Sequence, residues 1–341
     1  MRLFPRYWAG RFDTWEPPQQ SHPGYSLLVP VPGDLPVFLE LALAVLGTQN
    51  AHHRVETLVI PDRVTKAMSQ VVEAHVPDWS GPLGLVPLPM PERVILPKMR
   101  NPSRNHGVQF IEGVTRSKGD YIVLHDADLF ILEPDVLDEH YRVTKERDLH
   151  VCGVSPVWDD WFAERGLHLA ATWELCARRD WLRSFPPHLH MGHTAELFGE
   201  QHVFDTTLHA QALTDPQRVA VIDRSDEIVH FNYVISTYRH FERSTDDFLD
   251  DRFRLLLIRI FIDLFAEIPY NYVLPSMDEL HTSLAGGTGR VQYPAPTEQT
   301  CVNYVVFRDN VSRVLEGPWA RPVQADRAAS ALQTFDEFYR S

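Results

Sequence analysis

Two kinds of apolar run alternate along residues 25–125, and this alternation constrains the fold more than any other feature of the chain. Runs of Val, Leu, Ile and Tyr that end at Pro, Gly or Asp are typical of buried strands, whereas apolar residues spaced three or four apart predict helices. The predicted strands are residues 25–33, 55–63, 83–89 and 121–125, and the predicted helices are residues 35–49, 64–76 and 103–119. Strands that alternate with helices predict an α/β fold, in which a mostly parallel sheet carries helices on both faces.

The pattern loosens after residue 133 and becomes helical after about residue 241. The later predicted elements are strands at 219–224 and 228–234, a helix at 202–214 and a long loop at 283–297. We therefore predict an N-terminal arm (1–24), an α/β domain (25–240) and a C-terminal helical extension (241–341).

The charge balance argues against one class of partner. The chain has 341 residues and a formal net charge of −14, whereas binding to a nucleic-acid backbone needs clustered Lys and Arg. We therefore expect no nucleic-acid partner. An anionic substrate would need local positive charge at its binding site, from a metal ion or from a few arginines.

Cysteine usage and hydropathy predict a cytoplasmic protein without a membrane span. The three cysteines are widely spaced and odd in number, which favours reduced thiols. The first twenty residues lack the continuous apolar core of a signal peptide. The most apolar later run, residues 255–265, is short and contains Arg259 and Asp263, so it predicts a buried amphipathic helix instead.

The predicted strand at residues 121–125 runs directly into two carboxylates, Asp126 and Asp128. Like charges this close repel, and desolvation strengthens the repulsion, so a cation is expected beside them. Carboxylate oxygens at a strand end can bind a hard divalent cation, Mg2+ or Mn2+, with phosphate oxygens as further ligands. The alternative is that Asp126 caps a turn and Asp128 faces water. Asp62 also follows a predicted strand, and ligands of such sheets lie beyond the carboxyl ends of the strands.

Residues 103–138, SRNHGVQFIEGVTRSKGDYIVLHDADLFILEPDVLD, resemble the signature of GT-A-fold glycosyltransferases, especially the large family two. In that family a helix that begins with Arg-Asn leads through Gly-Asp-Tyr into an apolar strand ending in Asp-x-Asp, with a Pro a few residues later. The matching positions are Arg104, Asn105, Gly119, Asp120, Tyr121, Asp126, Asp128 and Pro134. The resemblance covers residues 25–135 well, 136–240 loosely and the remainder not at all.

This resemblance implies a GT-A (Rossmann-like) fold with a mixed, mostly parallel sheet. Residues 25–132 would form the nucleotide-binding half and residues 133–240 the acceptor half. Asp128 would be the principal ligand of Mn2+ or Mg2+, and Asp126 would touch the metal or the ribose. His230, in a late apolar run, would be a third metal ligand, since imidazole is acceptable to Mn2+; the alternative is a histidine satisfied within the core.

The resemblance also implies residues for the nucleotide. Asp62 would contact the base or the ribose, and Pro30 and Val31, on the opening strand, are predicted to bind the nucleotide. Arg104 and Asn105 are predicted to bind it as well, with Arg104 facing the diphosphate. Lys98 and Arg100, just before them, are alternatives for that contact, and Arg104 could instead be a surface residue on the first helical turn.

Three further features of such enzymes have counterparts after residue 185. Gly192 could supply a glycine loop at the donor site. Glu200 stands where the family often has the first residue of a Glu-Asp pair, but Gln201 follows it. The nearby histidines 188, 190 and 193 have zinc-like spacing without a convincing fourth ligand, so a solvated loop is predicted there.

Gln201 bears on the stereochemistry of the predicted reaction. In inverting family-two enzymes the aspartate of the pair is the general base, and glutamine cannot act as one. Either Glu200 or Asp205, one turn later on the predicted helix, serves as base, or the enzyme retains configuration and needs no side-chain base. An acidic residue followed by Gln also resembles retaining family-eight enzymes, which favours retention. The alternative for both carboxylates is capping of a helix N-terminus.

The sequence thus predicts a metal-dependent glycosyltransferase that uses a nucleoside-diphosphate sugar and a soluble small-molecule or saccharide acceptor. The C-terminal helices could close the acceptor site or support a homodimer. Competing classes are a phosphatase with an Asp-x-Asp motif, and a non-catalytic carbohydrate-binding protein that would stack sugars on the aromatic loop VWDDWF at 157–162. The phosphatase motif normally lies near the N-terminus and continues with Thr or Val rather than with Leu129.

Overall fold

The computed structural model describes residues 10–99, 101–243, 252–285 and 290–340. The chain packs as two compact units, each assembled from separate segments. Unit 1 comprises residues 1–33, 49–127 and 134–226, and unit 2 comprises residues 34–48, 128–133 and 227–341. The chain therefore passes from one unit to the other several times, and the predicted boundary at residue 240 stays a prediction.

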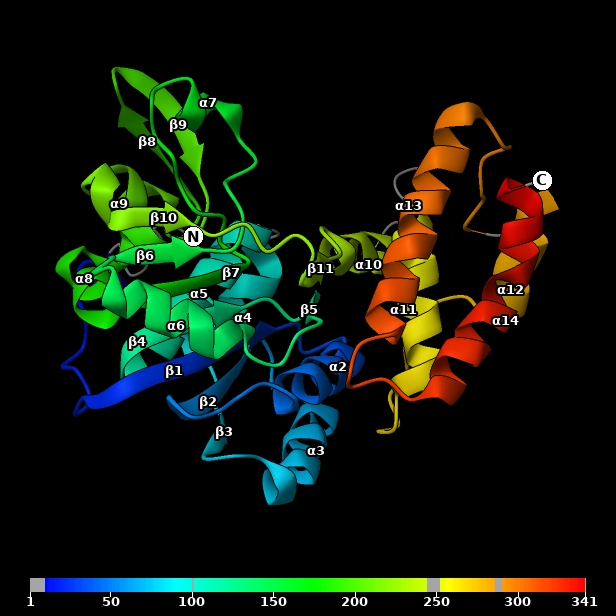
Figure 1. Cartoon of the computed structure of the whole chain (residues 1–341), viewed down its shortest axis with the longest axis horizontal. Helices are drawn as coiled ribbons and strands as arrows, with labels where there is room; N and C mark the ends of the chain where they lie inside the picture. Colours follow the sequence, from blue (N-terminus) through cyan, green and yellow to red (C-terminus); the bar gives the residue numbers. More distant parts are fainter. Residues whose placement is uncertain (1–9, 100, 244–251, 286–289, 341) are drawn as a thin grey trace. The chain divides into compact units, whose positions relative to one another are not determined.

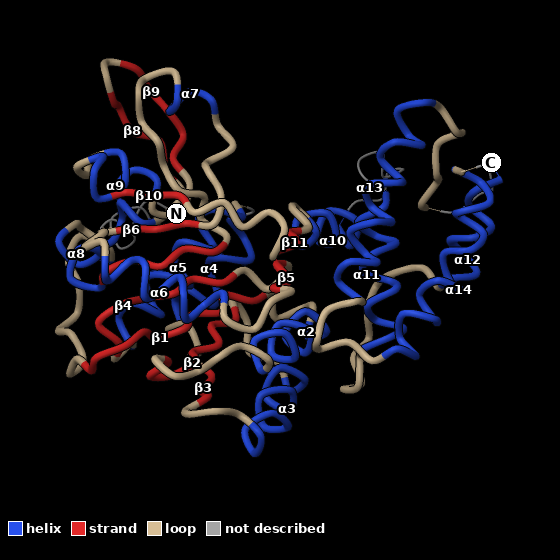
Figure 2. The backbone as a smooth tube through the Cα atoms, in the orientation of Figure 1, coloured by secondary structure: helices blue, strands red, loops and turns tan. Residues whose placement is uncertain are grey.

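Unit 1 is built on a seven-stranded sheet in the order β10-β6-β7-β4-β1-β2-β3 (Figures 1 and 2). Neighbouring strands are parallel except where β7 pairs with β4 and with β6. The prediction of a mixed, mostly parallel α/β sheet is confirmed. The strands are β1 (His22–Val31), β2 (Arg54–Pro61), β3 (Leu83–Leu85), β4 (Gly119–His125), β6 (Val151–Gly153), β7 (Glu174–Arg178) and β10 (Val219–Val221).

Helices cover both faces of this sheet, because alternate side chains of each strand are apolar on each side. On one face, Val114 of α5 (Pro102–Arg116) joins the core cluster that contains Leu28 and Leu124. On the other face, Tyr141 of α6 (Val136–Glu146) packs its ring 5.6 Å from that of Tyr25, between centroids. The remaining regular elements up to β7 are α3 (Lys66–His75), η1 (Val76–Asp78), α4 (Met90–Met99) and α7 (Asp160–Ala163).

The region after β7 is more regular than the sequence predicted. It contains α8 (Arg179–Ser184), η2 (Pro187–His190), β8 (His193–Leu197), β9 (Glu200–Phe204), α9 (Leu208–Ala212) and η3 (Pro216–Arg218). The prediction of one helix over residues 202–214 is wrong for its first part. Phe198 and Gly199 both have positive φ, 55° and 79°, and form the two-residue turn that pairs β8 with β9 as a hairpin.

Unit 2 combines α2 (Pro36–Gly47) and the two-stranded sheet of β5 (Leu129–Ile131) and β11 (Ile228–His230) with the C-terminal helices. The predicted helix over residues 255–265 is confirmed as part of α11 (Arg252–Phe265). Its Phe261 ring lies 6.1 Å from Phe38 of α2 and 5.4 Å from Phe130 of β5, between centroids, which ties these elements together. The other elements are α10 (Val234–Arg243), α12 (Met277–Thr282), η4 (Ser283–Ala285), α13 (Glu298–Leu315) and α14 (Pro322–Tyr339).

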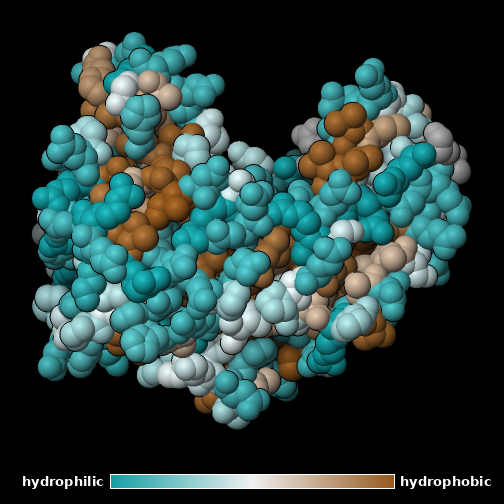
Figure 3. Space-filling view, in the orientation of Figure 1, coloured by the Kyte–Doolittle hydropathy of each residue, from teal (hydrophilic) through white to brown (hydrophobic). Residues whose placement is uncertain are grey.

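The surface of α13 is partly apolar. Val302 and Val306 are both more than half exposed, and Figure 3 shows hydrophobic side chains gathered over this helix. Among the described residues no helix is long and apolar enough to cross a membrane. Part of the predicted loop at 283–297, residues 286–289, lies outside the described residues, and so does Arg100.

Candidate functional site

The carboxyl ends of β1 and β2 are locked together by Asp62. Its backbone N–H donates to the Val31 carbonyl (3.2 Å), and its carboxylate accepts from the Gly33 N–H (2.9 Å). Glycine is required at position 33, because a Cβ there would lie 1.9 Å from the Arg63 carbonyl oxygen. Pro30 lies in the same buried strand end. The predicted nucleotide-binding residues 30, 31 and 62 therefore share one edge of the sheet, and Asp62 also has a structural role there.

A buried glutamine that sequence reasoning missed completes this edge. The side-chain amide of Gln109, on α5, donates to the carbonyls of Val31 (3.1 Å) and Ile60 (2.5 Å). One side chain thus satisfies acceptors on two neighbouring strands, which fixes α5 against the strand ends.

Asp126 follows β4 at the same edge and contacts two groups of unit 1, one of which is held by a third. Its backbone N–H donates to the Trp173 carbonyl (2.8 Å), and its carboxylate lies 2.9 Å from Nε2 of His106. His106 Nδ1 lies 3.0 Å from the hydroxyl of the buried Thr206. Neither His106 nor Thr206 was found from the sequence, although His106 follows the Arg-Asn pair directly. The network sets the orientation of the Asp126 carboxylate.

His125, directly before Asp126, forms a fully buried triad with Glu174 and His140. Glu174 Oε2 is 2.7 Å from His125 Nδ1, and Glu174 Oε1 is 3.6 Å from His140 Nδ1. Burial lowers the pKa of His140, but its side-chain interactions with Cys152 and with the Glu174 carboxylate outweigh burial and raise that pKa to about 9. His140 is therefore a cation that compensates the buried carboxylate.

Asp128 begins the part of the chain that belongs to unit 2 and lies beside His230. The strands β5 and β11 are antiparallel, with Leu129 opposite His230, and the Phe231 N–H donates to the Asp128 carbonyl (3.1 Å). This register brings His230 Nε2 to 3.5 Å from Asp128 Oδ1, with both side chains less than a tenth exposed. A hundred residues of sequence separate these two predicted metal ligands, and the fold brings them together.

Asp126 and Asp128 are restrained to a short separation by the chain itself. Only Ala127 lies between them, so their Cα atoms are at most about 7 Å apart in any conformation. Carboxylate oxygens and an imidazole nitrogen form a donor set that suits Mn2+ and, through its oxygens, Mg2+. The residue types present at this segment therefore fit the predicted metal.

Arg104 and Gly192 are brought into contact. Arg104 Nε donates to the Gly192 carbonyl (3.2 Å), and a Cβ at position 192 would lie 2.7 Å from Ser103 Cβ. Gly107, which the sequence did not single out, permits the same approach, because its Cβ would lie 2.4 Å from Met191 Cα. Gly192 thus lets a loop pack closely on α5. Asn105 is buried on the next position of that helix, and the Lys98 side chain is outside the described structure.

Glu200 and Asp205 have different surroundings. Glu200 is at the exposed start of β9, where its Oε2 accepts from Arg165 (2.5 Å) and from the indole N–H of Trp161 (3.2 Å). Asp205 directly follows the same strand and accepts from the Thr206 N–H (2.7 Å). Asp205 therefore adjoins the network that leads to Asp126, whereas Glu200 belongs to the hairpin.

The predicted solvated histidine loop is wrong for His190. That side chain is fully buried, its Nε2 lies 2.7 Å from the Leu182 carbonyl, and burial lowers its pKa to about 4. His193 pairs with His209 (2.8 Å between ring nitrogens), and only His188 is exposed. His190 and His193 therefore pack the loop against the core.

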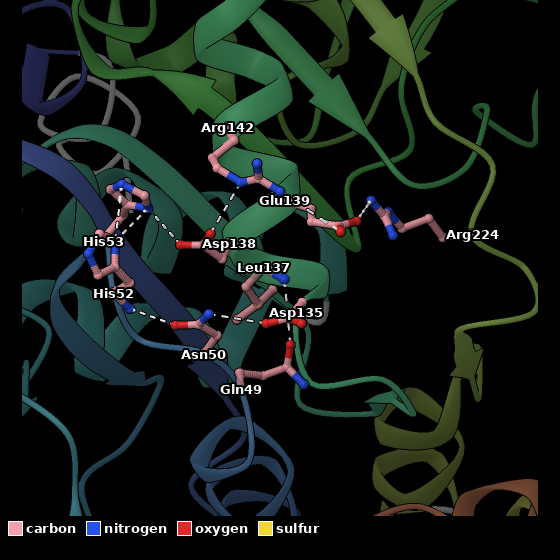
Figure 4. A network of polar contacts seen from close by, with 10 residues as sticks. All are labelled: Gln49, Asn50, His52, His53, Asp135, Leu137, Asp138, Glu139, Arg142 and Arg224. Carbon is pink, nitrogen blue, oxygen red and sulfur yellow. Dashed lines mark hydrogen bonds and ion pairs between the residues drawn. The ribbon is translucent and has the colours of Figure 1, made fainter.

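A second cluster of potential ligands, His52, His53 and Asp138, lies at the start of α6 (Figure 4). Asp138 is already paired on both sides, with His53 Nδ1 at 2.7 Å and Arg142 Nε at 3.3 Å. Nearby, the Asn50 amide donates to Asp135 (3.1 Å). This network ties α6 to the loop before β2.

Aromatic rings gather beside Asp126. Trp158 is half exposed, and its ring stacks near that of Trp173 at 6.1 Å between centroids. Trp161, in the same loop, stacks on His202 at 3.9 Å. The aromatic loop that the sequence indicated is therefore next to the residue whose carbonyl holds Asp126.

Comparisons with known proteins show a distant likeness. No family model and no curated protein matches the sequence. Among solved structures, the chain is similar to the mannosyltransferase PcManGT from Pyrobaculum calidifontis in complex with GDP-Man and Mn2+ (13% identity, TM-score 0.42; 98% of this chain and 93% of that chain). It is similar to residues 1–349 of S. aureus TarS (13%, 0.40; 93% and 89%), and it spans 54% of a longer TarS chain. A third is glucosyl-3-phosphoglycerate synthase from Mycobacterium tuberculosis with Mn2+ and UDP (13%, 0.39; 64% and 79%).

Proposed function

We propose that this protein is a metal-dependent glycosyltransferase of the GT-A type, which moves a sugar from a nucleoside-diphosphate sugar to a soluble acceptor. The observation that carries the proposal is the Asp128–His230 pair, 3.5 Å apart and nearly buried, in which Asp128 is the second aspartate of the Asp-x-Asp motif. The Asp-x-Asp motif alone does not carry the proposal, because Asp126 already has partners within the protein. A late histidine delivered to the second aspartate by a separate strand pairing supports metal binding.

Asp128 and His230 would hold the divalent cation, with Asp126 as the further predicted ligand. Bound there, the metal would offset the negative charge of the donor diphosphate. His106 and the Trp173 carbonyl would keep the Asp126 carboxylate in one orientation, which is the role that partners of metal ligands generally have.

The nucleotide would lie along the strand ends of unit 1. Asp62, Pro30 and Val31 form that edge, and Arg104 and Asn105 start the helix beside it. Arg104 would supply positive charge toward the diphosphate while it holds the loop at Gly192.

We propose a retaining transfer. Gln201 offers no base, and the charge of Glu200 is already met by Arg165. Asp205, which adjoins the Thr206–His106 network, is the base of the inverting alternative. The anomeric configuration of the product, determined by NMR, tests this: an inverted product together with an inactive Asp205→Asn variant that still binds donor would overturn retention.

The acceptor is a small molecule or a saccharide, and we propose that it stacks on Trp158, since exposed aromatic faces beside a polar site suit sugar rings. A cytoplasmic location and a homodimer formed through the C-terminal helices are further parts of the proposal. No nucleic-acid partner is proposed, in keeping with the net charge of −14.

The test is calorimetric titration of the full chain with a panel of nucleoside diphosphates, with and without Mn2+. The proposal predicts Mn2+-dependent binding of one or two nucleotides, which would also identify the donor. Binding of free oligosaccharides without any nucleotide binding would favour the carbohydrate-binding alternative. Release of phosphate from a phosphate ester would favour the phosphatase.

A further inference from the structure

A cavity of about 710 Å3 lies in unit 1 and is lined by residues at the amino end of β4 and from α6 and α8; Figure 1 shows where these elements lie. Four cationic side chains line it, Lys145, Arg178, Arg179 and Arg183, against two carboxylates, Asp120 and Asp180. A local excess of positive charge is unexpected in a chain whose net charge is −14. Known binding sites for small molecules have volumes in this range.

The two carboxylates are already engaged elsewhere. Asp180 receives two hydrogen bonds from Arg178, from Nε (3.0 Å) and from Nη2 (2.5 Å). Asp120 accepts from the Ser21 hydroxyl. Arg178 is also paired with Asp148 (3.0 Å), so its charge is met within the protein.

Unlike Arg178, Arg179 and Arg183 have guanidinium donors without a partner among the described residues. Arg179 is 4% exposed and donates from Nη2 to the Gln19 carbonyl (2.8 Å), but its Nε and Nη1 have no hydrogen-bond partner among the described residues. Arg183 donates from Nη2 to the Glu16 carbonyl, and its buried Nη1 likewise lacks a partner within the described chain. Buried guanidinium donors without acceptors are costly, so a ligand that supplies acceptors is indicated.

The electrostatics of the pair agree with this geometry. The pKa of Arg183 is lowered by burial and then by the charge of Arg179, and no carboxylate of the described residues offsets the repulsion. Burial also lowers the pKa of Arg179, while the more distant Asp120 and Glu56 act in the opposite direction. An anion between the two guanidinium groups would relieve both effects.

We propose that this cavity binds a small phosphorylated molecule, whose phosphate group accepts hydrogen bonds from Arg179 and Arg183 while Lys145 adds charge from α6. Phosphate fits better than a single carboxylate, because it carries close to two negative charges at neutral pH and has several acceptor oxygens for forked donors. The cavity is also larger than a free phosphate needs, which favours a phosphate ester.

The proposed cavity is separate from the metal and nucleotide site. Tyr121 of β4 lines the cavity, and Asp126, which directly follows β4, lies five residues further along the chain. At about 3.3 Å per residue these positions are roughly 17 Å apart. The inference therefore goes beyond the proposed transferase, and its test needs no transfer reaction.

The experiment is isothermal titration of the full chain with glycerol 3-phosphate and with inorganic phosphate, at low salt and without divalent metal. Arg183→Gln and Lys145→Gln should each weaken the binding, Arg183→Gln by about 10- to 100-fold, the range expected for a lost hydrogen bond to a charged group. Arg142→Gln, on the same helix as Lys145 and paired with Asp138, is the matched control and should bind as the wild type does. Thermal unfolding with and without ligand gives a second readout, since binding to the folded state raises the melting temperature.

Tighter binding of the ester than of phosphate supports a phosphorylated metabolite, and the reverse order supports free phosphate as the ligand of the same site. Two results would overturn the proposal. One is the absence of binding of either probe to the wild type at millimolar concentration. The other is binding that Arg183→Gln and Lys145→Gln leave unchanged, or that succinate, a dicarboxylate of similar charge, matches in affinity.

Discussion

The two ends of β4 differ in the charge of the side chains that surround them. At the carboxyl end Asp126 pairs with His106. The buried carboxylate of Glu174 lies there between His125 and His140. At the amino end Arg179 and Arg183 line a cavity, and each has a buried donor without a partner among the described residues. In a chain with net charge −14, the acidic end would attract a cation and the basic end an anion. Because the acidic and the basic side chains lie at opposite ends of β4, a proposed cation site and a proposed anion site can share one sheet.

The largest expected effect concerns the buried triad at the acidic end. Glu174→Gln removes the carboxylate that compensates His140, and breaking a buried ion pair from one side costs about 3–5 kcal/mol of unfolding free energy. Urea denaturation measures the loss. Glu164→Gln, at an exposed site, is the control and should change stability by less than about 0.5 kcal/mol. A loss no larger than that of the control would mean that the triad is not ionised.

The pH dependence of stability tests the same triad without mutation. The folded-state pKa of His140 is about 9, above its ordinary value of 6.5. The stabilisation is therefore fully present below pH 6.5 and is lost as the pH rises toward 9, by up to roughly 3 kcal/mol. Urea midpoints measured between pH 6 and 9.5 should fall in the wild type, and the fall should be much smaller in Glu174→Gln. Parallel pH profiles for the two proteins would contradict this.

A smaller effect is expected at His230. Removal of an imidazole ligand, as in His230→Ala, should weaken Mn2+-dependent nucleotide binding by about 10- to 100-fold, the range for tuning of metal sites. The exposed His188→Ala is the control. Unchanged binding accompanied by a lower melting temperature would assign His230 to the core alone.

The smallest predicted effect belongs to the network around Asp126. Thr206→Val keeps the shape of the side chain but removes the hydroxyl next to His106, and one lost hydrogen bond costs about 1 kcal/mol. Thr194→Val, exposed on β8, should have almost no effect on the urea midpoint. Equal effects of the two substitutions would show that Thr206 does not hold His106.

The sequence predicted the elements in which local pattern decides structure, and these include β1, β2, β4, α2 and α5. It also predicted Asp126, Asp128 and His230 as one set, through motif and chain order. It missed residues whose role depends on distant partners: Gln109 bridges two strands, and Glu174 lies between two histidines. Their types and spacings carry no local signal.

Two other features were not predicted from the sequence, for the same reason. The hairpin of β8 and β9 turns at Phe198 and Gly199, and Phe is an unusual residue for a positive φ. The arginine cavity joins residues of the N-terminal segment, β4, α6 and α8, which are far apart in sequence. Only the fold brings these groups together.

The central claim is that the acidic end of β4 and the following Asp128 bind a divalent cation. Electron paramagnetic resonance of Mn2+ titrated into the protein tests it directly, because bound Mn2+ loses the sharp signal of the free ion. The account predicts binding by the wild type that a nucleoside diphosphate tightens, and loss of that binding in Asp128→Ala with the fold retained. Equal Mn2+ binding by the wild type and by Asp128→Ala would contradict it.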